Sequence, residues 1–270
     1  MTGRGFPGNR AAFLPTETET MSVASSEKTR QKKGSGFGET VKIVIQALLL
    51  ALIVRTFLFQ PFNIPSGSMK STLLVGDYLF VSKYAYGYSR YSLPFGPDLF
   101  SGRIWAAEPE RGDVVVFKLP RDNSTDYIKR VIGLPGDQIQ VTHGVLYING
   151  EPVEREKVDQ WVDDDGIRYD RYRETLPNGV SYLTLDREPD GPEDNTQVYE
   201  VPEDHFFMMG DNRDNSTDSR VLSAVGYVPF ENLVGRAEVI FFSVGDGSPA
   251  WQFWRWPWTV RWDRMFTTVE

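Results

Sequence analysis

One apolar run constrains the fold of this chain more than any other part of its sequence. The run extends from Val41 to Val54, and its centre, residues 47–54, contains no polar side chain. Four basic residues within residues 28–33 precede it. A basic stretch followed by an apolar run is the order found in N-terminal membrane-targeting segments. The sequence therefore predicts a single membrane-spanning helix over residues 37–59.

A helix in a soluble core is the alternative, because Lys42, Gln46 and Arg55 interrupt the run. Lys42 and Arg55 lie about 20 Å apart along a helix, however, so their side chains can reach toward opposite membrane interfaces. Residues 55–62 contain no small-x-small tripeptide of the kind that a processing enzyme reads. The segment is therefore expected to remain as an uncleaved anchor.

The flanking charges predict the orientation of this anchor. Basic residues next to a membrane-spanning helix tend to stay in the cytoplasm. Residues 1–36, rich in Gly, Ser, Thr and charge, are accordingly expected to form a disordered cytoplasmic tail. Everything after about residue 60 is expected on the other side of the membrane.

Composition excludes two classes of chemistry for the remaining chain. The 270 residues include no cysteine, which rules out disulfides, thiolate metal sites and a cysteine nucleophile. The net charge is −8, and residues 151–204 hold 17 acidic against six basic residues, a local charge of −11. Nucleic-acid binding depends on basic groups that displace counterions from phosphates. Nucleic acid is therefore not an expected partner.

The body after the anchor has the pattern of a mainly β protein. Short apolar or alternating runs are separated by Gly, Pro and Asp, and no helical period spans ten residues. These runs lie at 78–81, 113–117, 127–132, 139–141, 145–148, 206–209 and 237–242. Residues 150–200 are acidic and rich in Gly and Pro, with only residues 180–185 suggesting a strand, and we expect them to form an inserted, smaller β subdomain.

The expected order of segments follows from these patterns. It comprises a tail (1–36), the anchor (37–59), the first part of a catalytic β body (60–149), the inserted acidic subdomain (150–200), the second part of the body (201–245) and a Trp/Arg-rich membrane-proximal tail (246–270).

Three segments of the body could carry chemistry. The first, residues 64–73, is a Pro-Ser-Gly turn that exposes the hydroxyl of Ser68 between apolar residues. It lacks the Gly-x-Ser-x-Gly pattern because Lys70 occupies the second Gly position, and it lacks Ser-x-x-Lys because Gly67 occupies the Ser position. An ordinary loop is the alternative for such a turn.

The second segment, residues 126–137, places Lys129 on a predicted strand. Alternate side chains share one face of a strand, so Lys129 lies with Tyr127 and Val131, whereas Ile128 and Arg130 face the other way. Removal of water from the ammonium by these apolar neighbours would lower its pKa and make it a possible base. A surface lysine is the alternative.

The third segment, residues 210–220, is polar at every position after Gly210. It fits a solvated loop, a calcium loop or a buried polar network. Its Asp spacing lacks the Gly and the terminal Glu of an EF-hand, so that type of calcium loop is excluded.

Together these three segments resemble bacterial type I signal peptidase (leader peptidase), a membrane-anchored protease with a Ser-Lys dyad. The resemblance covers residues 62–81, 111–137 and 201–237, and residues 210–220 are its most specific part. It implies that Ser68 is the nucleophile and Lys129 the general base. It also implies that the Ser66 side chain and the Ser68 amide form the oxyanion hole.

The resemblance assigns further residues to supporting and binding roles. Ser216 resembles a hydroxyl that orients the lysine, and Asp218 with Arg220 resembles a supporting ion pair. The walls of shallow pockets for small side chains are matched by Ile64, Pro65, Met69, Leu73, Tyr127 and Ile128. Lys70 and Ser71 stand where many relatives carry Met-Pro, and the segment 150–200 aligns with no motif of the family.

The implied function is cleavage of signal peptides from exported preproteins after small-x-small sites, without a metal or organic cofactor. Expected partners are signal peptides, membrane lipid and, functionally, the protein export machinery. The expected location is the bacterial inner (plasma) membrane, with one span and the catalytic body on the periplasmic or extracellular side. Two alternatives stay open: a cytosolic self-cleaving Ser-Lys repressor, disfavoured by the anchor, and an inactive tethered relative that binds signal sequences without cleaving them.

Residues 251–264 contain five of the seven tryptophans together with three arginines. An extended segment would place Trp254, Trp256 and Trp258 on one face. Such a segment is either a strand that buries its aromatic residues in the core or a membrane-interface element, for which Trp beside Arg is a typical composition.

Overall fold

The computed structural model describes residues 36–94, 96–163, 166–245, 247 and 251–269. The chain forms two units, residues 1–44 and residues 45–270. In the first unit the described residues include the beginning of helix α1 (Phe37–Phe57), which continues into the second unit. Apart from Gly36, the predicted disordered tail lies outside the described residues.

Helix α1 exposes apolar side chains. Leu48, Leu50 and Ile53 are 65%, 62% and 54% exposed. Among the described residues, α1 is the one helix that is long and apolar enough to cross a membrane. A helix in a soluble core would bury one face, so this exposure contradicts the core-helix alternative. The helix matches the predicted anchor but ends two residues before its predicted end, because Phe59 already begins a strand.

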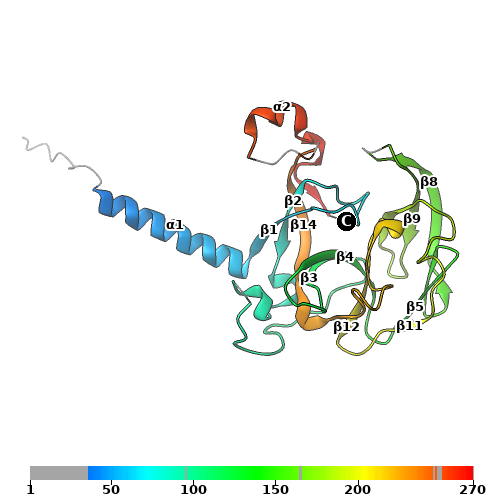
Figure 1. The fold of residues 1–270 in the computed structure, drawn as a ribbon. Helices are drawn as coiled ribbons and strands as arrows, with labels where there is room; N and C mark the ends of the chain where they lie inside the picture. Colours follow the sequence, from blue (N-terminus) through cyan, green and yellow to red (C-terminus); the bar gives the residue numbers. More distant parts are fainter. Residues whose placement is uncertain (1–35, 95, 164–165, 246, 248–250, 270) are drawn as a thin grey trace, which may run out of the picture. The chain divides into compact units, whose positions relative to one another are not determined.

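The main sheet of the second unit has eight strands, and all of its pairings are antiparallel (Figure 1). The order across the sheet is β1 (Phe59–Asn63), β2 (Asp77–Ser82), β14 (Leu233–Ser243), β3 (Val114–Lys118), β4 (Asp126–Gly133), β12 (His205–Met209) and β13 (Val228–Pro229), with β15 (Thr267–Thr268) paired to β14. Every apolar run predicted as a strand falls on a strand. The prediction of a mainly β body is confirmed.

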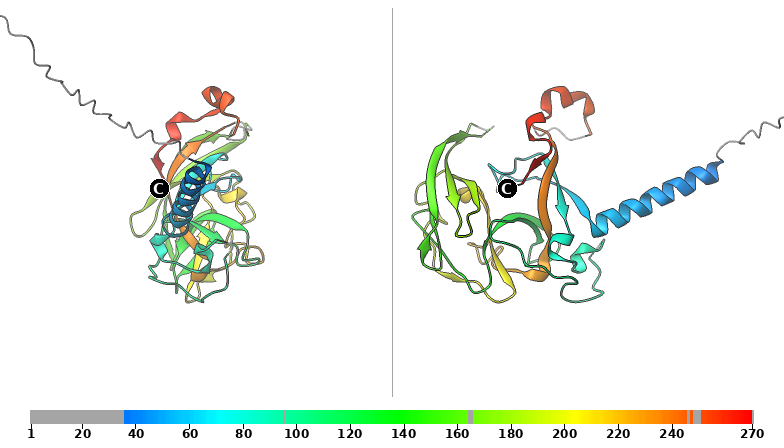
Figure 2. Two further views of the ribbon diagram at one scale, coloured as in Figure 1. Left: turned by 90° about the vertical axis from the view of Figure 1, so that its left-hand side faces the viewer. Right: turned by 180° about the vertical axis from the view of Figure 1, so that it is seen from behind.

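Two smaller sheets complete the β structure. One has the order β11 (Tyr199–Glu200), β5 (Gln138–Thr142), β6 (Val145–Ile148) and β7 (Glu151–Pro152), and the other has the order β10 (Ser181–Asp186), β9 (Arg168–Thr175) and β8 (Glu154–Val162). We call the β8–β9–β10 sheet the inserted sheet. In the right-hand view of Figure 2 its green strands curve along one side of the body.

The sequence predicted only β10 within the inserted sheet. Almost every side chain of β8 is exposed, so apolar and polar residues do not alternate there. Backbone pairing with β9 along most of its length holds β8 instead. A strand exposed on both faces lacks the periodic signal on which the prediction depends.

The short helices lie in connections between strands. They comprise the 3₁₀ turns Tyr84–Tyr86, Arg90–Ser92, Arg213–Asn215, Phe230–Asn232, Phe253–Arg255 and Trp262–Arg264, and the α-helix α2 (Trp256–Thr259). The tryptophan-rich segment is therefore helical, and the single-face alternation expected for Trp254, Trp256 and Trp258 does not apply. Trp258 is 81% exposed, whereas Trp256 packs against Phe242 of β14, with ring centroids 5.0 Å apart. The alternative of a buried core strand is wrong.

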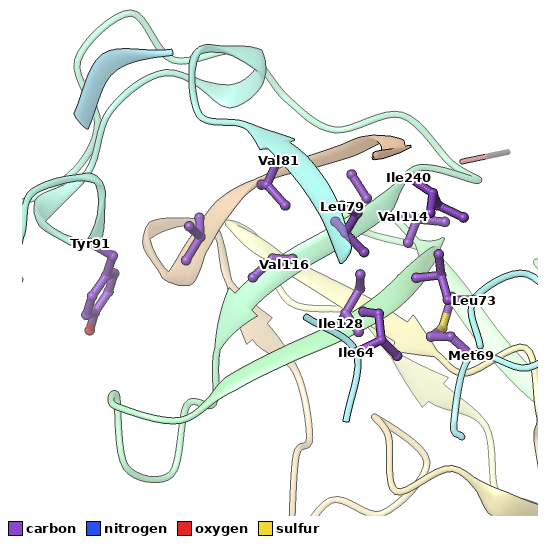
Figure 3. Close-up of a cluster of buried hydrophobic side chains, with 12 residues drawn as sticks. Ile64, Met69, Leu73, Leu79, Val81, Tyr91, Val114, Val116, Ile128 and Ile240 are labelled. Carbon is purple, nitrogen blue, oxygen red and sulfur yellow. The ribbon is translucent and has the colours of Figure 1, made fainter. Parts of the chain in front are cut away.

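One cluster of buried side chains lies between the turn after β1 and the main sheet (Figure 3). Ile64, Met69 and Leu73 come from the turn, and Figure 3 shows them beside Ile128 of β4. All four are at most 9% exposed. Burial of their apolar surface fixes the turn against the strand that carries Lys129.

Candidate active site

The connection between β1 and β2 presents Ser68 at the surface of the core. Backbone hydrogen bonds join Ile64 to the start of β2, from Ile64 N to Asp77 O (2.8 Å) and from Gly76 N to Ile64 O (3.0 Å). Met69 and Leu73 point into the core and are fully buried. Ser68 lies next to Met69 and is 7% exposed, so its hydroxyl is held at the rim of a packed cluster.

Lys129 lies opposite this hydroxyl. Its Nζ is 2.7 Å from Ser68 Oγ and 2.9 Å from the carbonyl oxygen of Ile128, to which it donates. The side chain is almost completely buried, and Nζ lies 5.3 Å from the centroid of the Tyr127 ring. Two segments 61 residues apart in the sequence thus bring a hydroxyl and an amine into direct contact.

Burial changes the acid–base behaviour of this amine. Removal of water lowers the pKa of Lys129 from 10.5 to about 8, although Asp218 and Asp211 oppose the change. At a pKa of 8, roughly a fifth of the molecules carry a neutral amine at pH 7.4, compared with about one in a thousand for an ordinary lysine. A neutral amine can accept a proton from a serine hydroxyl.

The loop of residues 210–220 forms a buried polar network beside the dyad. The Asp218 carboxylate accepts hydrogen bonds from the Arg220 guanidinium, with both N···O distances 2.9 Å, and from Gly210 N at 3.0 Å. Arg220 also donates to the carbonyl oxygen of Arg213 at 2.6 Å. Burial alone would raise the pKa of Asp218, but these donors lower it, so the carboxylate stays charged. Asp218 and Arg220 therefore form an ion pair inside the protein.

Gly210 allows this loop to approach Ser68. A Cβ atom at Gly210 would lie 2.2 Å from Ser216 Oγ and 2.6 Å from the carbonyl oxygen of Ser68. The Ser216 hydroxyl is buried and makes no hydrogen bond of ordinary geometry within the described residues, although it lies near enough to Asp218 to help lower the pKa of that carboxyl. The structure thus brings Ser216 into the site without a hydrogen bond to Lys129.

A cavity of about 510 Å³ opens beside Ser68 and Lys129. Residues 62–68 form one wall, and residues 125–129 at the start of β4 form the other. Ser66, which is exposed, lies at this cavity with its Oγ 3.5 Å from Ser68 Oγ. The site can therefore receive an extended chain next to a serine whose proton has an adjacent acceptor.

Residues 37–242 match the protein family described as "Signal peptidase, peptidase S26". The chain belongs to this family. The match covers the helix, the turn with Ser68, the strand with Lys129 and the 210–220 loop. The predicted family and the predicted class of enzyme, a signal peptidase, are confirmed, and the alternative of an inactive relative gains no support.

Related proteins carry the same family name. The chain is 50% identical to signal peptidase I of Rickettsia typhi over 204 residues, which cover 73% of this chain and 76% of the relative. It is 45% identical to signal peptidase I of Rickettsia massiliae over 228 residues, 82% of each chain. The crystal structure of a signal peptidase I from Enterococcus faecalis is 28% identical, covers 48% of this chain and 97% of its own, and gives a TM-score of 0.30.

The predicted pocket walls divide into two groups. Of the six predicted wall residues, four line the cavity: Ile64, Pro65, Tyr127 and Ile128. Met69 and Leu73 are instead fully buried in the cluster beneath the turn and do not line the cavity. The resemblance gave all six the same role, because the sequence does not show which side chains of the turn face the cavity.

Sequence reasoning missed a second buried ion pair next to the dyad. Arg130 donates to both oxygens of Asp211, from Nε at 2.9 Å and from Nη2 at 2.8 Å, and Thr72 Oγ1 donates to Asp211 at 2.5 Å. Arg130 and Asp211 are at most 1% exposed. This network joins the strand of Lys129, the 210–220 loop and the turn of Ser68. Alternation along the strand predicted that Arg130 and Lys129 face opposite sides, but it did not indicate which acidic residue binds Arg130.

A second missed contact connects the 210–220 loop to the inserted sheet. Arg213 donates to both carboxylate oxygens of Glu174 on β9, and the Tyr182 hydroxyl on β10 donates to the same carboxylate at 2.9 Å. All three side chains are buried. Arg213 lies in the 210–220 motif, whereas Glu174 lies in a segment that aligns with no motif, so no sequence pattern indicates that the two residues pair.

One acidic cluster in the described part of the chain has the geometry to hold a cation. Carboxylate oxygens of Asp186, Asp194 and Asp214 lie within 4.8 Å of one another. Burial raises the pKa of Asp186 and Asp194. Arg155 donates to Asp186, and backbone amides donate to Asp194 and Asp214, so the protein itself supplies partners to these carboxylates.

Proposed function

We propose that this signal peptidase cleaves preproteins with Ser68 as nucleophile and Lys129 as general base. The observation that carries the proposal is the 2.7 Å contact between Ser68 Oγ and a buried lysine amine. A serine hydroxyl is a weak nucleophile unless an adjacent base accepts its proton. The lowered pKa of Lys129 supplies such a base near neutral pH.

In the first half of the reaction, Ser68 Oγ attacks the carbonyl carbon of the scissile peptide bond while its proton moves to Lys129 Nζ. The oxyanion is held by the backbone amide of Ser68 and the side-chain hydroxyl of Ser66. The tetrahedral intermediate then collapses. The carbon–nitrogen bond breaks, and the Lys129 ammonium donates its proton to the leaving amine.

In the second half, Lys129 removes a proton from a water molecule, which attacks the acyl carbon. The ester bond to Ser68 breaks, and the proton returns to Ser68 Oγ, which restores the dyad. Asp218 and Arg220 support the site by fixing the 210–220 loop, and Ser216 orients Lys129 by a hydrogen bond made when substrate excludes water.

The cavity explains the choice of substrate in this proposal. An extended signal peptide lies between residues 62–68 and the start of β4, where Ile64, Pro65, Tyr127 and Ile128 contact its side chains. The turn and the strand approach closely at Ser68, so the walls admit small side chains next to the scissile bond. The expected cleavage site is therefore a small-x-small tripeptide.

The proposed placement at the membrane rests on helix α1, on the basic cluster before it and on exposed tryptophans near the C-terminus. Helix α1 anchors the protein as its single span, and the basic cluster before it keeps the N-terminus in the cytoplasm. The catalytic body then lies outside the cytoplasm, where export machinery delivers preproteins. Exposed Trp251, Trp254 and Trp258 contact membrane lipid at its interface, where aromatic side chains are favoured.

Incubation of the detergent-solubilised full chain with a preprotein tests this function. The expected product has a new N-terminus directly after a small-x-small tripeptide. Its sequence is read by N-terminal sequencing or mass spectrometry. Failure to cleave, or cleavage after unrelated residues, would contradict the proposal, and a Ser68→Ala preparation purified in parallel excludes a contaminating protease.

A further inference from the structure

Lys70 lies two residues after Ser68 and takes no part in the dyad. Its aliphatic stem passes close to the residue before the nucleophile, because a Cβ atom on Gly67 would lie 3.0 Å from Lys70 Cε and 3.2 Å from Cδ. Its backbone amide also donates to the Gly67 carbonyl oxygen at 3.2 Å. Lys70 therefore covers the turn on which Ser66 and Ser68 lie.

The ammonium group of Lys70 reaches the inserted sheet. It forms an ion pair with Asp163, the residue directly after β8, and the side chains are 14% and 5% exposed. The Trp161 ring lies beside the same ammonium, with its centroid 5.9 Å from Nζ. Asp163 is held in turn by its backbone amide, which donates to the Ile167 carbonyl oxygen at 2.9 Å.

The inserted sheet also contacts the other side of the site. Glu174 on β9 binds Arg213 of the 210–220 loop. The Arg130 guanidinium, adjacent in sequence to Lys129, stacks on Tyr182 of β10 with 4.2 Å between the guanidinium carbon and the ring centroid. One sheet thus touches the segments that carry the nucleophile, the base and the supporting ion pair.

We propose that Asp163 is a positioning residue that acts on the nucleophile through Lys70. Asp163 and Trp161 hold the Lys70 ammonium, and the held lysine stem fixes Gly67 and hence the positions of Ser66 and Ser68. The inference rests on the proposed roles of these two serines. It gives the inserted sheet a function in catalysis rather than in folding alone.

Physical chemistry sets the expected size of the effect. Removal of the Asp163 charge takes the ion-pair partner from the largely buried Lys70 ammonium, which then draws water or moves. Movement of Lys70 releases Gly67, and a displacement of about 1 Å in reacting groups can lower a rate by roughly a hundredfold. The dyad contact between Ser68 and Lys129 is not itself removed, so partial activity should survive.

A mutant cycle on the full chain in detergent tests the inference. The variants are Asp163→Asn, Lys70→Met and the double variant, where Met keeps an unbranched stem over Gly67 but removes the charge. We expect each single variant to lower kcat by roughly tenfold to a hundredfold while KM changes by less than about twofold. The double variant should lose about as much as the weaker single variant, because both changes remove the same interaction.

Two further variants separate positioning from general stability. Lys157 and Asp170 form an ion pair on the exposed face of the same β8–β9 hairpin, so Asp170→Asn is the matched control and should leave kcat unchanged. Asp163→Glu retains the charge and should recover most of the activity. The ascending limb of the pH–rate profile should stay in place in Asp163→Asn, because the surroundings of Lys129 are unchanged.

Three outcomes would overturn the inference. They are a double variant with normal kcat, losses in the single variants that multiply in the double variant, and a rise in KM without a fall in kcat. Each is distinct from failure of the proposed function, in which the unmodified chain would not cleave the preprotein. Circular dichroism and thermal unfolding of every variant establish that the compared proteins are folded.

Discussion

At the scale of single residues, the proposed role of Lys129 as general base makes the rate depend on its protonation state. Burial lowers its pKa to about 8, and only a neutral amine can act as the proposed base, so kcat/KM should rise with pH through about 8. The rate should rise with pH rather than fall, because an ammonium cannot accept the proton of Ser68. A profile of kcat/KM between pH 6 and pH 10.5 measures this limb. An ascending limb near 10.5, or a rate that falls as pH rises through neutrality, would contradict Lys129 as the base.

Ser66 allows a second test on one side chain. If its hydroxyl stabilises the oxyanion, Ser66→Ala should lower kcat by roughly two to three orders of magnitude with little change in KM, the usual cost of one oxyanion donor. The Ser68 amide remains, so activity should not vanish. Steady-state kinetics on a peptide substrate gives both constants. An unchanged kcat would make Ser66 a turn residue without a part in catalysis.

At the scale of elements, the 210–220 loop needs a residue without a side chain at its start. Gly210→Ala places a Cβ atom against Ser216 and the Ser68 carbonyl, so the loop or the nucleophile turn must move. We expect a loss of stability of about 1–3 kcal/mol from this overpacking and a fall in kcat of at least about tenfold. Denaturant unfolding and peptide cleavage measure the two effects. Gly38→Ala, where a Cβ atom meets no neighbour within 4 Å, is the control and should behave as the unmodified chain.

The elements also show how far the sequence predicts the structure. Strands β2, β3 and β4 were predictable because apolar residues bury at least one face of each. Strand β8 was not, because its side chains face solvent and its position depends on pairing with β9. The ion pair of Lys70 with Asp163 was not predicted either, because 93 residues separate its partners in the sequence.

Within the site, local patterns predicted the residues, whereas only the fold gives their distances. Motif resemblance proposed Ser68 and Lys129, and strand alternation placed Lys129 beside Tyr127. No local pattern indicated that Arg130 would bind Asp211, because that contact requires β4 and the loop after β12 to meet. Ile64 and Met69, which the resemblance treated alike, are both buried in one cluster, but only Ile64 also lines the cavity.

At the scale of the whole molecule, the charge before α1 predicts the orientation of the chain in the membrane. With the basic cluster in the cytoplasm, the body after residue 60 lies outside, and the described residues contain no second helix that could return it. Protease added to intact spheroplasts should therefore digest the body. Protection of the body together with loss of the N-terminal tail would show the opposite orientation, and digestion after permeabilisation controls for protease access.

The central claim is that Ser68 and Lys129 act as one catalytic unit, and the most direct test is the rate of preprotein cleavage by Ser68→Ala and Lys129→Ala. Nucleophile and base depend on each other, so each single change should cost nearly as much as both together. We expect both variants and their double variant to be folded and to cleave at the same residual rate, several orders of magnitude below the unmodified chain. Near-normal turnover by folded Lys129→Ala, measured as the appearance of the processed N-terminus, would contradict it.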